Sequence, residues 1–213
     1  MVAVALKTIT AKLANRHFTV AEVGAMLNIG ATEVNNLIAE IAHLGVTRSG
    51  GGKRTVAYRG LFALLVAREL IHCQLRPEMR PQILFAALKA RGKRVAVHGT
   101  NLEILVEPYR KDVQKGLRSL YEAEEVVSYS NEIMQGEPCI KGTRVPVYIL
   151  GAIAAAHGVE EALNTYPFLL PRHVEMALLY VRAHPRKGRP KKTVIPAVGD
   201  VVAKKVIKRK KHG

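Results

Sequence analysis

The chain has 213 residues, of which 48% are apolar and 5% aromatic, and its formal net charge at pH 7 is +16. This length allows two small folded domains, and the composition is typical of globular proteins with aliphatic cores. The sequence holds no uncharged apolar run of about eighteen residues and no N-terminal signal pattern, so we expect a cytoplasmic protein that does not contact a membrane.

Residues 1–92 are predicted to form a winged helix-turn-helix domain. Thr19 and Glu22 have the spacing of a capping box, which predicts that a helix begins there. Residues 28–30 are the expected turn, and a second helix begins near Thr32 with its apolar positions at helical spacing. This second helix is the candidate recognition helix for DNA.

A wing is expected directly after the second helix. Residues 46–48 and 53–58 are predicted strands, and residues 49–52, which include three glycines, are the turn between them. A long helix then runs from residue 60 to about residue 74. This order of helix, turn, helix, wing and long helix resembles the winged DNA-binding domains of the MerR type.

Polar side chains on the outer face of the second helix and basic side chains on the wing are the candidate DNA contacts. Asparagine amides pair bidentately with adenine, threonine reaches a base edge or a phosphate, and lysine and arginine bind the DNA backbone. The candidate residues are Thr32, Asn35, Asn36, Arg48, Lys53 and Arg54. Residues 29–44 contain no Lys or Arg and carry Glu33 and Glu40, so affinity must come from the wing, dimerisation or the tail. The alternative is a winged helix used for protein contact.

Residues 60–90 are predicted to form two helices that break around residues 76–77. Apolar residues at helical spacing are the expected core of this region. They are Leu61, Leu64, Leu65, Ile71, Leu75, Ile83, Leu84 and Leu88.

Residues 93–128 are predicted to be a connector or a dimerisation element. Residues 94–107 indicate a hairpin of two strands with its turn at residues 99–101. A helix begins at Pro108 and ends near Glu124, where a group of glutamates is expected to be solvated. The sequence leaves open whether this element bridges two domains or builds a dimer interface.

Residues 129–185 are predicted to contain three short helices with tight turns. The first runs over residues 147–157, the second over 159–166, and Pro171 opens the third. The expected apolar face of the third helix consists of Val174, Ala177, Leu178 and Val181. Three such helices indicate a small bundle of the DNA-binding type.

This segment carries a sequence motif that is rich in glycine, proline and basic residues. The set comprises Gly136, Pro138, Ile140, Gly142, Thr143, Arg144, Val145, Pro146, Val147, Tyr166, Pro167, His184, Pro185, Gly188, Arg189 and Pro190. At these residues the segment resembles an antitoxin domain long catalogued as a domain of unknown function, with VapB-type members. The resemblance implies a homeodomain-like fold, a toxin-antitoxin operon and a partner nuclease of the PIN or PIN-like class.

Residues 186–213 form a basic tail with eleven Lys or Arg residues against one acid, Asp200. Such a segment cannot bury its charge, so we expect a flexible arm. It suits nucleic-acid phosphates or the acidic catalytic cleft of a partner nuclease, unless it only aids solubility. The candidate toxin-binding residues are Arg144, Arg186, Lys187, Arg189, Lys191, Lys192, Lys208 and Arg209.

The sequence shows no catalytic pattern. The eight histidines lie in unrelated segments, Cys73 and Cys139 form no metal-binding pair, and no cluster of carboxylates or phosphate loop is present, so we expect neither an enzyme nor a cofactor or metal site.

The predicted fold is therefore mainly α with small β-hairpins, with an N-terminal winged helix-turn-helix and a C-terminal homeodomain-like three-helix domain. The predicted function is that of an antitoxin that binds a cognate PIN-type ribonuclease and represses its own operon. As a homodimer within a larger toxin-antitoxin complex, it would bind a palindromic operator. One alternative is a stand-alone transcriptional regulator without a toxin, in which both helical domains and the tail bind DNA. Another is a non-specific nucleic-acid protein held on DNA by its tail alone.

Overall fold

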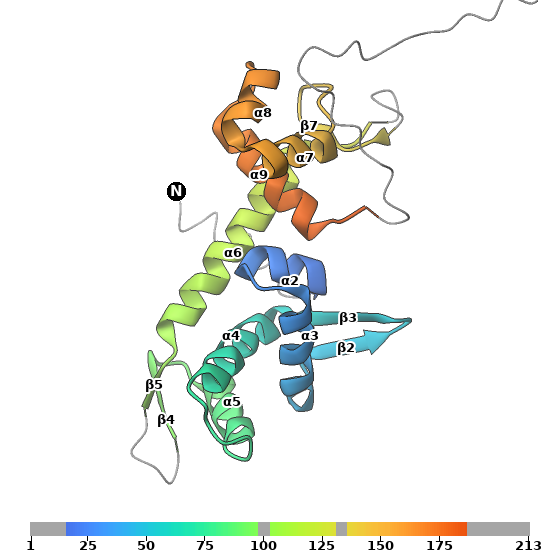
Figure 1. Cartoon of the computed structure of the whole chain (residues 1–213). Helices are drawn as coiled ribbons and strands as arrows, with labels where there is room; N and C mark the ends of the chain where they lie inside the picture. The colour runs from blue at the N-terminus through green and yellow to red at the C-terminus, as the bar shows by residue number, and fades with distance from the viewer. Residues whose placement is uncertain (1–15, 98–102, 131–135, 187–213) are drawn as a thin grey trace, which may run out of the picture.

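The computed structural model describes residues 16–97, 103–130 and 136–186 (Figure 1). Within these ranges the chain forms eight α-helices and three small antiparallel sheets. The predicted fold class, mainly α with small β-hairpins, is confirmed. None of the helices in the described ranges combines the length and the apolar character that are needed to cross a membrane.

The N-terminal elements form a helix-turn-helix followed by a wing. They are β1 (His17–Thr19), α2 (Val20–Leu27), α3 (Ala31–Glu40), a short 3-10 helix η1 (Ala42–Leu44), β2 (Thr47–Gly50) and β3 (Lys53–Ala57). Strand β3 lies between β1 and β2, and both of its neighbours are antiparallel to it. Strands β2 and β3 form a hairpin whose tip projects away from the helices (Figure 1). This hairpin is the predicted wing, and it lies beside α3.

Helix α2 begins with the predicted capping box. The Glu22 backbone N–H donates to Thr19 Oγ1 at 3.2 Å, and the Thr19 N–H donates to Glu22 Oε2 at 2.7 Å. The helix ends at Asn28, which has a φ of 53° and starts the turn. A Cβ on Gly24 would lie 2.8 Å from the Ile29 carbonyl oxygen, so this tight turn requires glycine at that position.

The middle of the chain packs against the helix-turn-helix. Its elements are α4 (Tyr58–His72), α5 (Arg80–Lys89), β4 (Arg94–Ala96), β5 (Glu103–Leu105) and α6 (Glu107–Glu125). The prediction that Ile71 is a core residue is wrong, because its exposed fraction is 37% while that of Leu70 is 3%. Ile71 is seven residues after buried Leu64 and so shares its helical face. It is nevertheless exposed, because it lies in the last turn of α4, where the next residues, His72 and Cys73, are exposed as well. The expected hairpin turn at residues 99–101 lies outside the described residues.

The C-terminal elements form a second hydrophobic core. They are β6 (Val127–Ser128), β7 (Cys139–Ile140), α7 (Val147–His157), α8 (Val159–Thr165) and α9 (Pro171–Ala183). Helix α9 buries Val174, Ala177, Tyr180 and Ala183, whereas Leu178 and Val181 of its predicted apolar face are only half-buried. The buried set differs from the predicted one because α9 packs against α2 and α6 as well as against α7.

The two cores are joined through α6 and α9. Helix α6 runs diagonally from the β4–β5 hairpin to the C-terminal helices (Figure 1). It places Val113 and Leu117 in the first core and Ala123 in the second, while Ala183 of α9 belongs to the first core. Leu179 packs against both cores. The helix-turn-helix is therefore packed directly against the C-terminal unit.

Candidate nucleic-acid interface

Helix α3 presents a polar outer face and an apolar inner face. Its inner residues Val34, Leu37 and Ile38 are buried, while Thr32 and Asn36 are exposed. Asn35 is half-buried, and its Nδ2 donates to the Ala31 carbonyl oxygen at 3.0 Å. Part of the hydrogen-bonding capacity of Asn35 is thus used within its own helix, which makes Asn36 the freer of the two candidate amides.

The acidic residues of α3 are paired with arginines of neighbouring segments. Arg68 Nε lies 2.7 Å from Glu33 Oε1, and Arg80 Nη1 lies 3.6 Å from Glu40 Oε1. Both arginines come from the helices that follow the wing, α4 and α5. The negative charge that weakened the sequence argument for DNA binding is therefore compensated within the fold.

The wing carries exposed cations close to its tip. Arg48, Lys53 and Arg54 are all exposed. In the β2–β3 ladder Arg48 is opposite Thr55, Gly50 is opposite Lys53 and Ser49 is opposite Arg54. Because side chains alternate along a strand, Arg48 and Lys53 share one face of the hairpin and Arg54 lies on the other.

Two further features complete this surface. Gly51 and Gly52 make the turn at the wing tip with φ angles of 57° and 75°, in the region that favours glycine. Arg59, two residues after β3 ends and in the first turn of α4, is exposed as well. Arg59 is not among the predicted DNA contacts, although its position directly after the wing was a usable signal.

The predicted toxin-binding residues fall into three groups. Arg144 is exposed in the turn between β7 and α7. Arg186 forms an ion pair with Glu137, and its guanidinium carbon lies 4.5 Å from the centre of the Tyr148 ring, so it is engaged within the chain. The others, Lys187, Arg189, Lys191, Lys192, Lys208 and Arg209, lie outside the described residues.

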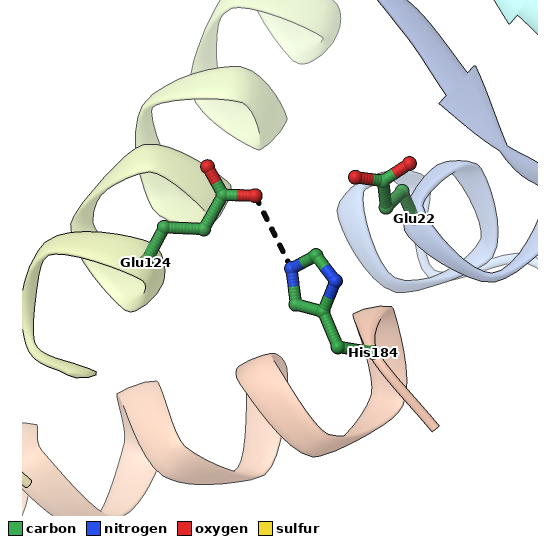
Figure 2. Close-up of side chains that lie close together, drawn as sticks. All are labelled: Glu22, Glu124 and His184. Carbon is green, nitrogen blue, oxygen red and sulfur yellow. Dashed lines mark hydrogen bonds and ion pairs between the residues drawn. The ribbon is translucent and has the colours of Figure 1, made fainter. Parts of the chain in front are cut away.

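An ion-pair network lies where α2, α6 and α9 meet. Arg16 Nη1 donates to Glu124 Oε2 at 2.9 Å, and Arg16 Nη2 donates to Glu124 Oε1 at 2.6 Å. The same guanidinium pairs with Glu22, and His184 Nε2 lies 3.2 Å from Glu124 Oε1. Figure 2 shows Glu22, Glu124 and His184 converging from three different helices or helix ends. The expectation that Glu124 is solvated is wrong, because only 26% of its side chain is exposed.

The network changes the titration of its charged members. Burial alone would raise the pKa of Glu124, but the hydrogen bonds from Arg16 and His184 outweigh it and lower the pKa to about 2. The hydrogen bond to Glu124 raises the pKa of Arg16, against the opposing effect of burial. Both groups are therefore held in their charged forms.

Glu22, Glu124 and His184 bring three potential metal-ligand atoms within 4.8 Å of one another. The Arg16 guanidinium already binds both carboxylates of this group. It supplies the positive charge that a metal ion would bring, so the arrangement fits a structural ion-pair network and does not require a metal.

A tyrosine cluster lies beside this network. The hydroxyl groups of Tyr129 and Tyr180 are hydrogen-bonded to each other, and the Tyr148 hydroxyl donates to the His184 carbonyl oxygen at 2.7 Å. Burial, together with the hydrogen bond to Tyr129, raises the pKa of Tyr180. The Tyr180 phenol therefore stays protonated, and the hydrogen bonds of the cluster anchor the end of α9, which carries His184.

Comparison with known proteins places a family match on the C-terminal unit. Residues 127–181 match a family described as a protein of unknown function (DUF433). The chain is also 34% identical over 120 residues to an uncharacterized protein, y4eO, of Sinorhizobium fredii (strain NBRC 101917 / NGR234). This alignment covers 55% of the chain and 54% of that relative, so the chain spans about half the length of the relative it matches. No solved structure matches the chain.

Proposed function

We propose that this protein is a DNA-binding repressor that places α3 in the major groove and the β2–β3 wing along the phosphate backbone. The observation that carries the proposal is the combination of exposed Thr32 and Asn36 on α3 with exposed Arg48, Lys53 and Arg54 on the adjacent wing. The polar side chains suit base edges, and the cations suit phosphates.

Helix α3 would contact bases through uncharged polar side chains, and the basic wing would contact phosphates. Asn36 carries the donor and acceptor that pair with adenine, while Thr32 lies in the first turn of α3, close to where a backbone phosphate would pass. Arg48 and Lys53 share a face of the wing and would neutralise phosphates without reading sequence. A homodimer would present two such units to a palindromic operator.

A binding titration with base and phosphate variants tests this proposal. The probe is the tightest duplex that the wild-type, full-length protein selects from a random-sequence library. Arg48→Ala should weaken binding to all duplexes similarly and reduce the salt slope by about 1, whereas Asn36→Ala should lose about 1–3 kcal/mol of discrimination at one base pair. Arg172→Ala is the control, since Arg172 is exposed on α9 and pairs with Glu122. If Arg48→Ala binds DNA as this control does, the wing is not part of the DNA interface.

The second candidate function is neutralisation of a PIN-type ribonuclease by the C-terminal unit. It is favoured by the overlap between the matched residues 127–181 and the motif that resembles the VapB-type antitoxin domain. Arg144 lies in this motif and its side chain is exposed. An exposed cation there suits a carboxylate-lined nuclease cleft, where it would compete with metal or with RNA phosphate.

Co-purification with the products of neighbouring reading frames tests the antitoxin function. A small acidic nuclease that stays bound in fixed ratio through about 0.5 M salt, which removes most phosphate-mediated contacts, would support it. Arg144→Glu should release the nuclease and restore its activity, while Lys141→Glu, an exposed position in the same turn, should not. Recovery of the protein alone, with only salt-sensitive DNA, would favour the stand-alone regulator.

A further inference from the structure

Helix α2, the first helix of the helix-turn-helix, packs against two helices that lie outside the helix-turn-helix. It packs against α9 and α6 as well as against α3. A Cβ on Gly116 of α6 would lie 2.6 Å from the Met26 carbonyl oxygen, so the two helix backbones are in close contact. The Arg16 network ties Glu22 of α2 to Glu124 of α6.

One polar contact reaches the turn itself. Arg182, near the end of α9, donates from Nη2 to Asn28 Oδ1 at 2.9 Å. Asn28 caps α2 in the left-handed conformation, and Gly30, two residues later, is the N-cap of α3. Because only three residues separate the two helices, a side chain that holds Asn28 also fixes the direction in which α3 starts.

We propose that the C-terminal unit positions the helix-turn-helix for DNA binding, with Arg182 as a positioning residue that acts on α3 through Asn28. The inference rests on the proposed DNA-binding function and adds the residue pair that positions the recognition helix. Since Arg182 is exposed, its hydrogen bond contributes little to the stability of the fold. The hydrogen bond instead fixes the orientation of α3. Orientation matters because recognition side chains must be held within about 0.5 Å of the productive geometry.

A competing role for Arg182 is direct contact with a DNA phosphate. The two roles differ in their dependence on salt, since loss of a phosphate contact reduces the salt slope by about 1 and loss of a positioning contact leaves it unchanged. They also differ in additivity. Two residues that act through one shared contact give a double variant no worse than either single variant.

The experiment is a double-mutant cycle on the full-length protein with its selected duplex. Arg182→Ala removes the donor, and Asn28→Gly removes the acceptor while glycine keeps the left-handed backbone. Each single variant should weaken DNA binding roughly 3- to 10-fold, and the double variant should match the singles, with the salt slope and the unfolding temperature unchanged. Arg182→Lys should retain most of the affinity because it keeps a donor. Arg172→Ala, on the same helix but paired with Glu122, should bind as the wild type does.

Three results would overturn the inference while leaving DNA binding intact. They are wild-type affinity in Arg182→Ala, a reduced salt slope, and losses that add in the double variant. Backbone amide chemical shifts in the absence of DNA give a second measurement, in which Arg182→Ala should move the signals of α3 and Arg172→Ala should not. Wild-type protein that selects no duplex would overturn the proposed function and this inference together.

Discussion

Replacement of Glu124 by glutamine tests whether the Arg16 network stabilises the contact between the two units. Glu124 accepts two hydrogen bonds from Arg16 and lies 3.2 Å from His184 Nε2, with 26% of its side chain exposed. A fall of its pKa from the ordinary 4.5 to about 2 corresponds to about 3 kcal/mol of unfolding free energy. Partial solvation, and the hydrogen bonds that glutamine retains, reduce the expected loss to about 2 kcal/mol at neutral pH.

The sign of the pH dependence follows from the lowered pKa. Because the folded protein binds a proton at Glu124 less readily than the unfolded chain does, the carboxylate contributes fully above the unfolded pKa of 4.5. The contribution then decreases as the pH falls toward about 2. The difference in stability between the wild type and Glu124→Gln should therefore be largest at neutral pH and shrink through this acid range.

Urea unfolding followed by far-UV circular dichroism at several pH values provides the measurement. Glu125→Gln is the matched control, because Glu125 is the next residue on α6 and is exposed. The control should change the unfolding free energy by less than about 0.5 kcal/mol. A loss in Glu124→Gln that equals the control, or one that does not vary between neutral and acid pH, would refute the reasoning.

Two further predictions concern packing and thiol chemistry. Gly116→Ala should lower stability by about 1–3 kcal/mol in calorimetry, because the new methyl group meets the Met26 carbonyl at 2.6 Å, while Gly151→Ala meets a valine methyl group and should cost less. An unchanged or raised unfolding temperature in Gly116→Ala would contradict the close approach of α2 and α6. Cys73 is exposed, whereas Cys139 is buried and its pKa is raised by that burial, so a thiol reagent should modify Cys73 rapidly and Cys139 only on unfolding. Equal rates for the two thiols in the folded protein would contradict this assignment.

Local patterns were enough to predict the helices and the wing, but not the short strands β1, β6 and β7. The capping box at Thr19 and Glu22 depends on residues three apart, and the wing depends on consecutive glycines between two strands, so both signals lie within a few residues. The same holds for the three C-terminal helices, whose ends coincide with Gly158 and Pro171. These predictions needed no knowledge of which elements pack together.

The contacts between units could not be predicted in this way. Arg16 and Glu124 are 108 residues apart, and Arg182 and Asn28 are 154 apart, so no periodicity or spacing in the sequence connects them. The error at Glu124 has the same origin. A glutamate near a helix end is solvated by default, and only the arrival of Arg16 and α9 makes it part of a half-buried network.

The packing of α9 bears on which of the two helical units could read DNA. In a homeodomain-like unit the third helix reads the major groove, and α9 is the third helix of the C-terminal unit. Here α9 lies between α7 and the pair α2 and α6, with Tyr180 and Ala183 buried and Arg182 bound to Asn28. Reading DNA with the end of α9 that carries Arg182 would require breaking the contact between Arg182 and Asn28. A regulator in which both units read DNA at once is therefore disfavoured by the fold. The arrangement instead suits the proposed function, in which α3 alone would read DNA and the C-terminal unit would support it, with Arg144 exposed.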